Sequence, residues 1–295
     1  MTDGGEAPAE VGGGVPRSGR AGLPGGPARR RQRISDQETA QRMLDTAVAM
    51  VNSTGLTVSL EHLSVEDVIR DSGVSRSAAY RRWPYKDLFV GDLLRALAKA
   101  VVPATVGAEG GADVVRRVLE EHRQELHDAE GRARVWSELL RLGAWHDFDA
   151  IHRSVEWRTY LALHATFESL ADGELRDEIQ TALEESERGF VDRIAAAYRR
   201  VADLLGYRLR PGSEVGFTAV ARLANATMRG MVITALSTPD TATVRYRADP
   251  LGTGRLADWS LPGLAIAAVV AGQFEVDPTV TWNPERVRDL LSAAG

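Results

Sequence analysis

Residues 64–89, SVEDVIRDSGVSRSAAYRRWPYKDLF, carry the pattern that decides the predicted fold. Ser64 and Asp67 form a capping-box pattern, which opens a short helix that ends near Ser72. Gly73 then begins a tight turn. The segment therefore starts with a short helix and a glycine turn.

A second short helix is predicted directly after this turn. Ser75 is a good N-cap for it, and Pro84 prevents it from continuing beyond Trp83. A longer helix with an apolar stripe follows over about residues 85–102. We interpret Trp83 as a core residue of the small domain that these helices form.

A supporting helix precedes the two short ones. Apolar residues recur at helical spacing from Ser35 until Gly55, where the helix is predicted to stop. A supporting helix followed by two short helices around a glycine turn is the helix-turn-helix arrangement, which places its last helix in the major groove of DNA. The pattern therefore points to a DNA-binding domain over residues 29–90, while helix pairs joined by a glycine turn also occur in many α-proteins that do not bind DNA.

Specific residues within this pattern point to a known family. They are Gly73, Val74 and Ser75 at the turn, then Tyr80, Trp83, Pro84, Lys86 and Leu88. Through them the chain resembles the TetR family of bacterial transcriptional regulators, over about residues 31–90. The resemblance implies an all-α homodimer that represses transcription from a palindromic operator until a small molecule binds. The chain departs from the family's usual residues at Ile69, Asp71 and Tyr85.

The first turn of the second short helix is predicted to face the base edges. Arg76 is able to bind guanine O6 and N7 with two hydrogen bonds. Ser77 offers a hydroxyl group, and Ala78 offers a methyl group that suits thymine. We therefore predict that these three residues read the DNA sequence.

Four further residues are predicted to contact DNA phosphates. Tyr80 and Lys86 resemble the family's phosphate contacts, and free N–H groups at the start of the helix near Lys86 also favour an anion. Arg81 and Arg82 are expected to add contacts with the DNA backbone. Without the motif, these arginines would be read as a solvated helix face.

The N-terminal segment precedes the predicted domain. Residues 1–28 are rich in Gly, Pro and Ala, a composition typical of a disordered tail. The cluster that contains Arg30, Arg31 and Arg33 is either an arm that enters the minor groove or a solubilising tail. The net charge is −5, but residues 1–102 hold 14 basic and 12 acidic residues, whereas the remainder holds 22 and 29. This asymmetry fits an N-terminal part that approaches a polyanion.

Residues 91–295 are predicted to form a larger helical domain that binds an effector and dimerises. Helices are expected near 112–129, 131–144, 149–171, 174–205, 213–236, 261–275 and 284–293. Hydrophobic residues do not recur at a regular spacing within residues 238–258. We therefore interpret this segment as a long surface loop that contacts another subunit or covers a pocket.

An effector pocket is predicted from a local enrichment of histidine and aromatic residues. Residues 122–167 hold five of the six histidines and six of the eighteen aromatic residues. The predicted pocket residues are Trp145, Trp157, Tyr160, His164 and Phe167. The alternative is a helical core in which these side chains simply pack.

The sequence offers no positive sign of an enzyme. There is no cysteine, no HExxH, no GxSxG and no phosphate-binding loop, so we predict no catalytic residue, metal or cofactor. The absence of cysteine and of a long apolar run leads us to expect a cytoplasmic protein without a membrane partner.

Dimerisation is expected because a single helix-turn-helix buries too little surface for high specificity. The late helices 213–236 and 261–275 are the candidate interface, since their small and apolar residues permit close helix packing. The alternative is that these two helices form the internal core of one subunit. An alternative function is also open. The chain is then a helical ligand- or protein-binding module that keeps the helix-turn-helix as a scaffold without binding DNA.

Overall fold

The computed structural model describes residues 35–54, 63–100, 108–212 and 214–288. Contacts divide the chain into two units, Met1–Ser35 and Asp36–Gly295. The predicted tail over residues 1–28 and the predicted arm residues Arg30, Arg31 and Arg33 lie outside the described residues.

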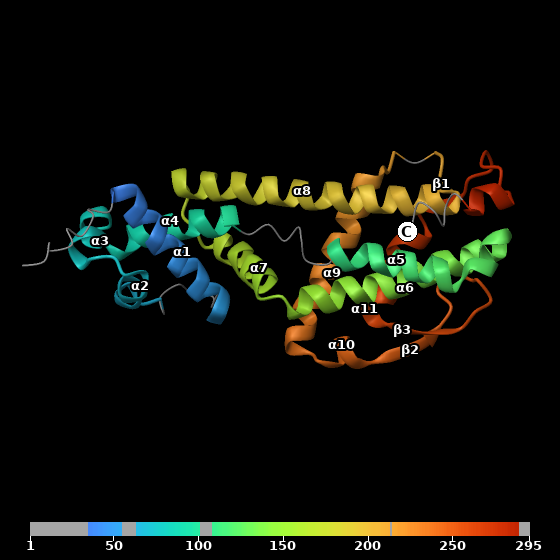
Figure 1. Cartoon of the computed structure of the whole chain (residues 1–295), viewed down its shortest axis with the longest axis horizontal. Helices are drawn as coiled ribbons and strands as arrows, with labels where there is room; N and C mark the ends of the chain where they lie inside the picture. The colour runs from blue at the N-terminus through green and yellow to red at the C-terminus, as the bar shows by residue number, and fades with distance from the viewer. Residues whose placement is uncertain (1–34, 55–62, 101–107, 213, 289–295) are drawn as a thin grey trace, which may run out of the picture. The chain divides into compact units, whose positions relative to one another are not determined.

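The described residues are mostly helical, which agrees with the predicted all-α class (Figure 1). The first four helices are α1 (Asp36–Thr54), α2 (Val65–Ser72), α3 (Arg76–Arg82) and α4 (Lys86–Ala100). Helix α1 contacts the other three and so supports the two short helices. Helix α4 is continuous and contacts both α1 and the later helices α7 and α8.

The later helices depart from the predicted boundaries in places. They are α5 (Ala108–Glu121), the 3₁₀ helix η3 (Arg123–His127), α6 (Ala129–Arg153), α7 (Val155–Glu168), α8 (Glu174–Leu205), α9 (Phe217–Ser237), α10 (Asp240–Thr243) and α11 (Leu261–Ala271). The predicted break between residues 144 and 149 is wrong, because that stretch contains no helix-breaking residue. The helix instead ends at Ser154, whose hydroxyl group caps α7 by accepting a hydrogen bond from the Trp157 N–H at 3.1 Å.

The first of two small antiparallel sheets, together with α10, corrects the prediction of an irregular loop over residues 238–258. Strand β2 (Arg245–Ala248) pairs with β3 (Ala257–Ser260), and β1 (Tyr207–Leu209) pairs with β4 (Phe274–Val276). The Asp249 carboxylate organises the hairpin loop by accepting hydrogen bonds from the backbone N–H groups of Thr253 and Gly254. Strands of four residues are too short to show a clear alternation in sequence.

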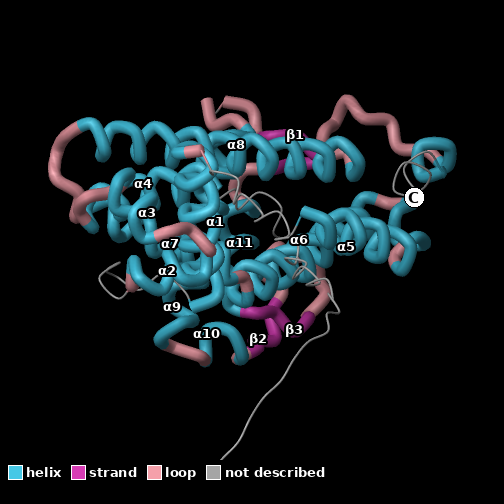
Figure 2. Tube along the Cα trace, turned by 60° about the vertical axis from the view of Figure 1, so that its left-hand side comes forward, coloured by secondary structure: helices cyan, strands magenta, loops and turns pink. Residues whose placement is uncertain are grey.

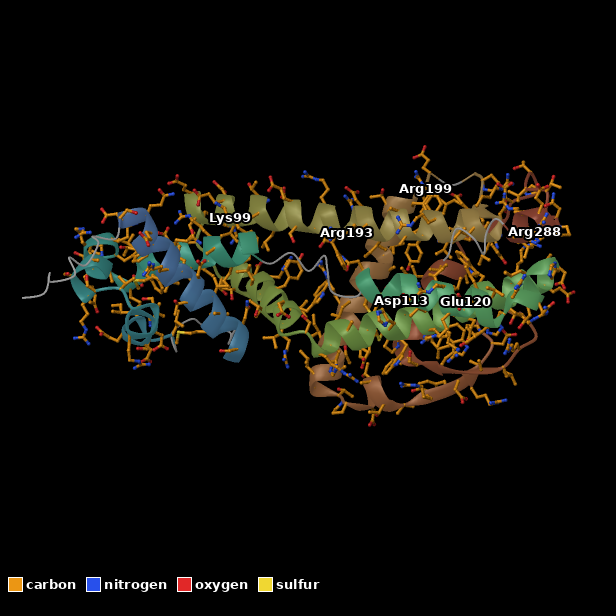
Figure 3. The ribbon with its side chains drawn as sticks, in the orientation of Figure 1. Lys99, Asp113, Glu120, Arg193, Arg199 and Arg288 are labelled. Atoms are coloured by element: carbon orange, nitrogen blue, oxygen red, sulfur yellow. The ribbon has the colours of Figure 1, made fainter. Side chains whose placement is uncertain are left out.

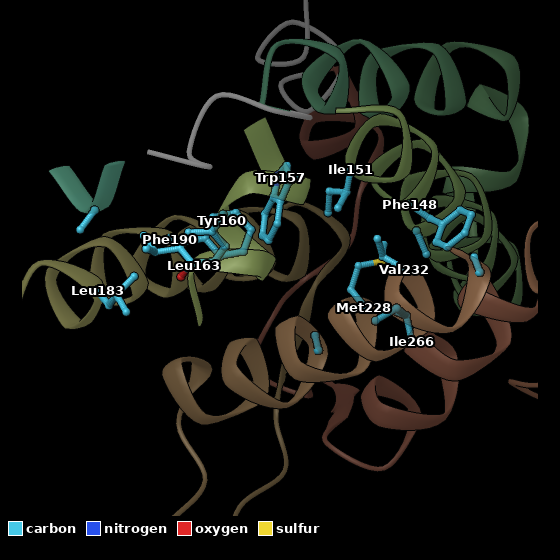
Figure 4. Packing of buried hydrophobic residues seen from close by; sticks show 14 of the residues in the cluster. Phe148, Ile151, Trp157, Tyr160, Leu163, Leu183, Phe190, Met228, Val232 and Ile266 are labelled. Carbon is cyan, nitrogen blue, oxygen red and sulfur yellow. The ribbon is translucent and has the colours of Figure 1, made fainter. Parts of the chain in front are cut away.

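Helix α6 provides the centre of the later core. It contacts α5, α9 and α11, and ten of its 25 residues are buried. Figure 2 draws the β2–β3 hairpin in magenta below α6 and α11, and β3 contacts both helices. Figure 4 shows Phe148 and Ile151 of α6 near Met228 and Val232 of α9. Charged side chains occupy the exposed positions, such as Asp113 on α5 (Figure 3).

None of the helices in the described part of the chain is long and apolar enough to cross a membrane.

The start of α6 offers a test of close packing. A Cβ atom added at Gly131 would lie 1.8 Å from the Glu125 carbonyl oxygen, whereas one added at Gly143 of the same helix meets no heavy atom within 4 Å. We expect Gly131→Ala to lower the free energy of unfolding by about 1–3 kcal/mol through overpacking. Gly143→Ala should raise it by about 0.5–1 kcal/mol through helix propensity. Denaturant unfolding measures both, and equal effects would contradict the packing at Gly131.

Candidate functional site

Local capping interactions build the α2–turn–α3 segment. The Ser64 hydroxyl accepts a hydrogen bond from the Asp67 N–H at 3.2 Å, and the Ser75 hydroxyl accepts one from the Ala78 N–H at 3.3 Å. Gly73 ends α2 in the left-handed conformation, with φ at 68°, which glycine adopts without a steric penalty. These contacts confirm the predicted helix starts and the predicted turn.

Trp83 fixes α3 to the start of α4. It is buried, as predicted, and its ring contacts Phe89 edge-to-face at 5.1 Å between centroids. Its indole N–H donates a hydrogen bond to an Asp92 carboxylate oxygen at 2.9 Å. Ala79 completes the buried side of α3. The helix therefore has one face in the core and its remaining side chains outside.

The exposed side of α3 carries most of the residues predicted to bind DNA. Arg76, Ser77, Tyr80, Arg81 and Arg82 are all exposed, and so is Lys86 at the start of α4. Ala78 differs, because it is half-buried and packs against the core. Ala78 is therefore the least accessible of the three predicted base-reading residues.

A glutamate of α2 bridges two of these exposed residues. One carboxylate oxygen of Glu66 lies 2.6 Å from Nη2 of Arg76, and the other accepts a hydrogen bond from the Tyr80 hydroxyl at 2.8 Å. The hydrogen bond with Glu66 is the main reason that the pKa of Tyr80 is raised. No local sequence pattern marks Glu66 as a site residue, because its contacts form only when α2 and α3 fold around the turn.

The other two arginines of α3 also face carboxylates. Arg81 forms an ion pair with Asp36 at the start of α1, and Arg82 lies 3.3 Å from Asp92 of α4. Exposed ion pairs contribute little to stability, about 0–1 kcal/mol, and exchange partners readily. Phosphates are therefore able to compete with these carboxylates for the arginines.

A shallow groove lies beside this surface. It has a volume of about 310 Å³ and runs between the start of α2 and the α3–α4 junction. Its walls include Glu66, Tyr80, Tyr85 and Lys86. Two residues predicted to contact phosphates, Tyr80 and Lys86, thus share one groove with the Glu66 carboxylate.

The predicted effector-pocket residues gather only in part. Trp157, Tyr160 and His164 lie on α7, where the Tyr160 ring contacts the other two rings edge-to-face. Trp145 instead lies under Arg245 of β2, whose guanidinium is 4.0 Å from the ring centroid. Phe167 lies near the end of α7 against Arg176 of α8. The structure therefore brings three of the five residues into contact, and the other two lie elsewhere.

A polar network surrounds Tyr160. Its hydroxyl group donates a hydrogen bond to Glu187 of α8 at 3.2 Å and accepts one from Arg229 of α9 at 3.0 Å. Glu187 also pairs with Arg229 and accepts a hydrogen bond from Asn225 at 2.9 Å. The sequence offered a signal for this site, since Arg229 is a charged residue in the otherwise largely apolar α9.

Burial shifts the pKa values of two side chains in this network. It raises the pKa of Tyr160 to about 12 and lowers the pKa of His164, so both side chains are neutral at pH 7. The indole N–H of Trp157 and the Nε–H of Arg229 are buried without a hydrogen-bond partner among the described residues. These two donors are suited to a ligand or a water molecule that offers acceptor oxygens.

Helix α7 also contacts the N-terminal helices. The Thr159 hydroxyl group donates a hydrogen bond to the Asn52 side chain of α1 at 3.1 Å, and Thr159 precedes Tyr160 in the chain. Both Thr159 and Tyr160 are fully buried. One turn of α7 therefore contacts α1 on one side and the Glu187–Arg229 pair on the other.

No group of three or more possible metal ligands occurs among the residues that the structure describes. Comparisons of the chain with family models, with curated proteins and with solved structures find no match. The resemblance to TetR regulators therefore rests on the motif within residues 64–89.

The network around Tyr160 gives a stability prediction. Glu187→Leu leaves the largely buried Arg229 without its carboxylate, so we expect the free energy of unfolding to fall by about 1–3 kcal/mol. Adding Arg229→Met should restore more than half of this loss, because the unpaired charge is then removed. Denaturant unfolding of the two single variants and the double variant measures the coupling. Additive losses would contradict a direct Glu187–Arg229 interaction.

Proposed function

We propose that the protein is a DNA-binding transcriptional regulator, a homodimer that binds a palindromic operator and is released by a small molecule. The single observation that carries the proposal is the α2–turn–α3 geometry. Helix α3 follows a three-residue turn that contains a left-handed glycine, and buried Trp83 holds it. Its outer face presents Arg76, Ser77 and Tyr80. This is the geometry that a recognition helix requires.

In this proposal α3 enters the major groove while the α3–α4 junction contacts the phosphates. Arg76 is exposed and has N–H groups beyond the one directed to Glu66, so it is able to read guanine. Lys86 and the groove beside it lie at the start of α4, where the positive end of the helix dipole favours an anion. Base reading and phosphate binding are thereby assigned to adjacent parts of one small surface.

The DNA-binding proposal is tested by selecting fragments from a genomic DNA pool and titrating the enriched duplex at several salt concentrations. Arg76→Ala should lose about 1–3 kcal/mol of discrimination between the enriched duplex and a scrambled one. Lys86→Ala should weaken binding to both duplexes alike. It should also reduce the slope of the logarithm of the binding constant against the logarithm of the salt concentration by about one. Arg153→Ala, which removes an exposed arginine paired with Asp149 on α6, serves as the control. Absence of any salt-dependent DNA binding by the wild-type protein would contradict the proposal.

One observation favours the alternative function as a binding module. Each arginine of α3 faces a carboxylate, namely Arg76 with Glu66, Arg81 with Asp36 and Arg82 with Asp92. A surface neutralised in this way attracts DNA less than free arginines do. The salt titration separates the two functions, since a scaffold that does not bind DNA shows no steep negative slope.

The dimer part of the proposal is supported by an apolar stripe on α9. Leu223, Ala226, Gly230 and Ile233 follow one another at spacings of three and four residues, and all four are exposed. The small residues in the centre of the stripe permit close approach of a second helix, as in a four-helix bundle. We therefore propose that α9 forms the centre of a two-fold interface with a second copy of the chain.

Helix α11 differs from the other predicted interface helix. Pro262, Gly263, Ile266, Ala267 and Val270 are buried within the chain, where α11 packs on α6 and α9. Its main contribution in a single subunit is therefore to the core. The proposed interface thus depends on α9 more than on α11.

The dimer proposal gives a separate prediction. Ile233 is 52% exposed in the single chain, so Ile233→Glu should leave the fold intact while placing a charge in the interface. We expect self-association to weaken by about tenfold or more, which is about 1.4 kcal/mol. Val276→Glu, on β4 at 45% exposure, is the matched control. Sedimentation measures both variants, and an equal effect would contradict the α9 interface.

The effector part of the proposal concerns α7. A ligand with acceptor oxygens that binds Trp157 and Arg229 would change the packing of the turn that also contacts Asn52 of α1. Binding of an effector shifts the population towards the state for which it has the higher affinity. We propose that the α7–α1 contact couples effector binding to the position of α3, which α1 supports.

A further inference from the structure

Glu66 is a single carboxylate with two partners on the proposed recognition helix. One oxygen binds Nη2 of Arg76 at 2.6 Å, and the other accepts the Tyr80 hydroxyl hydrogen bond at 2.8 Å. The three residues are exposed, so the contacts are open to competition from a ligand. In the described structure, Arg76 and Tyr80, two of the side chains expected to contact DNA, are therefore bound by a residue of the preceding helix.

The two partners differ in how many hydrogen bonds they are able to donate. A tyrosine hydroxyl group has one hydrogen atom, so Tyr80 donates either to Glu66 or to a phosphate oxygen, but not to both. An arginine has five N–H donors in a planar fork, so Arg76 keeps donors for a base while one nitrogen stays on Glu66. DNA binding therefore competes with the Glu66–Tyr80 bond but is compatible with the Glu66–Arg76 pair.

The position of Glu66 makes this competition electrostatic as well. Glu66 lines the same groove as Lys86, and a phosphate bound there would meet its negative charge at close range. The cost applies to every DNA sequence, since every duplex presents the same phosphates. In contrast, Glu66 holds the Arg76 guanidinium group in one orientation. Arg76 therefore loses less conformational freedom on binding guanine than it would without Glu66. That gain applies only to duplexes with guanine at the right position.

We propose that Glu66 is a specificity-determining residue, which weakens binding to all DNA through Tyr80 and aligns Arg76 for the cognate base. The inference rests on the proposed DNA-binding function. Binding to any DNA breaks the hydrogen bond between Tyr80 and Glu66, which costs free energy. On the cognate site the Arg76–guanine hydrogen bonds offset this cost, and on non-cognate DNA nothing offsets it. Glu66 therefore lowers affinity and raises the ratio of specific to non-specific binding.

The test compares Glu66→Ala with Asp67→Ala on the enriched duplex and on a scrambled duplex of equal length. Asp67 is the neighbouring carboxylate, and it pairs with Arg70 on α2 rather than with α3. Both variants thus lose one negative charge from the same turn. We expect Glu66→Ala to bind the scrambled duplex about threefold more tightly, while its specificity ratio falls about fivefold. Asp67→Ala should leave the specificity ratio unchanged.

A double-mutant cycle isolates the competition for Tyr80. In a Tyr80→Phe background the hydroxyl group is absent, so Glu66→Ala should lose most of its gain in affinity for the scrambled duplex. Glu66→Gln is a second variant that keeps the side-chain length and removes the charge. It should show the same signs with smaller changes, because its amide oxygen still accepts a hydrogen bond.

Three results would overturn the inference while leaving the DNA-binding function intact. These are equal effects of Glu66→Ala and Asp67→Ala on the specificity ratio, a Glu66→Ala variant that weakens binding to both duplexes alike, and additive effects of Glu66→Ala and Tyr80→Phe. The failure of the proposed function is distinct. It is the absence of salt-dependent binding by the wild-type protein to any duplex.

Discussion

The indole N–H of Trp83 binds Asp92, and the position of α3 depends on this contact. The hydrogen bond joins the end of α3 to α4, while the Trp83 ring closes the small core against Phe89. Asp92 also pairs with Arg95, which in turn forms an ion pair with Glu178 of α8. One carboxylate therefore connects the proposed recognition helix with the longest helix of the described chain. A displacement of α8 relative to α4 would act directly on the residues that hold α3.

A second route between the same parts runs through α7. Thr159 binds Asn52 of α1, and the next residue, Tyr160, joins the Glu187–Arg229 pair. The two routes differ physically. The route through Asp92 consists of partly exposed ion pairs, which salt screens, whereas the contacts of α7 are largely buried and are screened much less. The proposed coupling between an effector and α3 should therefore persist at salt concentrations that weaken the proposed DNA binding.

Interactions within a few residues were predictable from the sequence, and interactions across the chain were not. Ser64, Gly73 and Ser75 placed the ends of α2 and α3 because a cap acts on backbone groups two to three residues away. The pairing of β1 with β4 joins segments more than sixty residues apart, and no local pattern encodes it. The same difference between local and long-range interactions decides which residues of the candidate site were predictable. Exposed positions on α3 followed from helical spacing, whereas the carboxylate that faces Tyr80 depends on how two helices meet.

The ion pairs on α3 illustrate why a sequence of basic residues does not by itself define a DNA-binding surface. Arg76, Arg81 and Arg82 contribute three positive charges, but each meets a carboxylate from a different helix, α2, α1 or α4. Long-range attraction to DNA is thereby reduced, while each guanidinium keeps further N–H donors for short-range contacts. If the proposed function holds, such a surface should bind weakly to phosphates in general. Its affinity should rise where base contacts add to the phosphate contacts, so the local carboxylates would favour selective over indiscriminate binding.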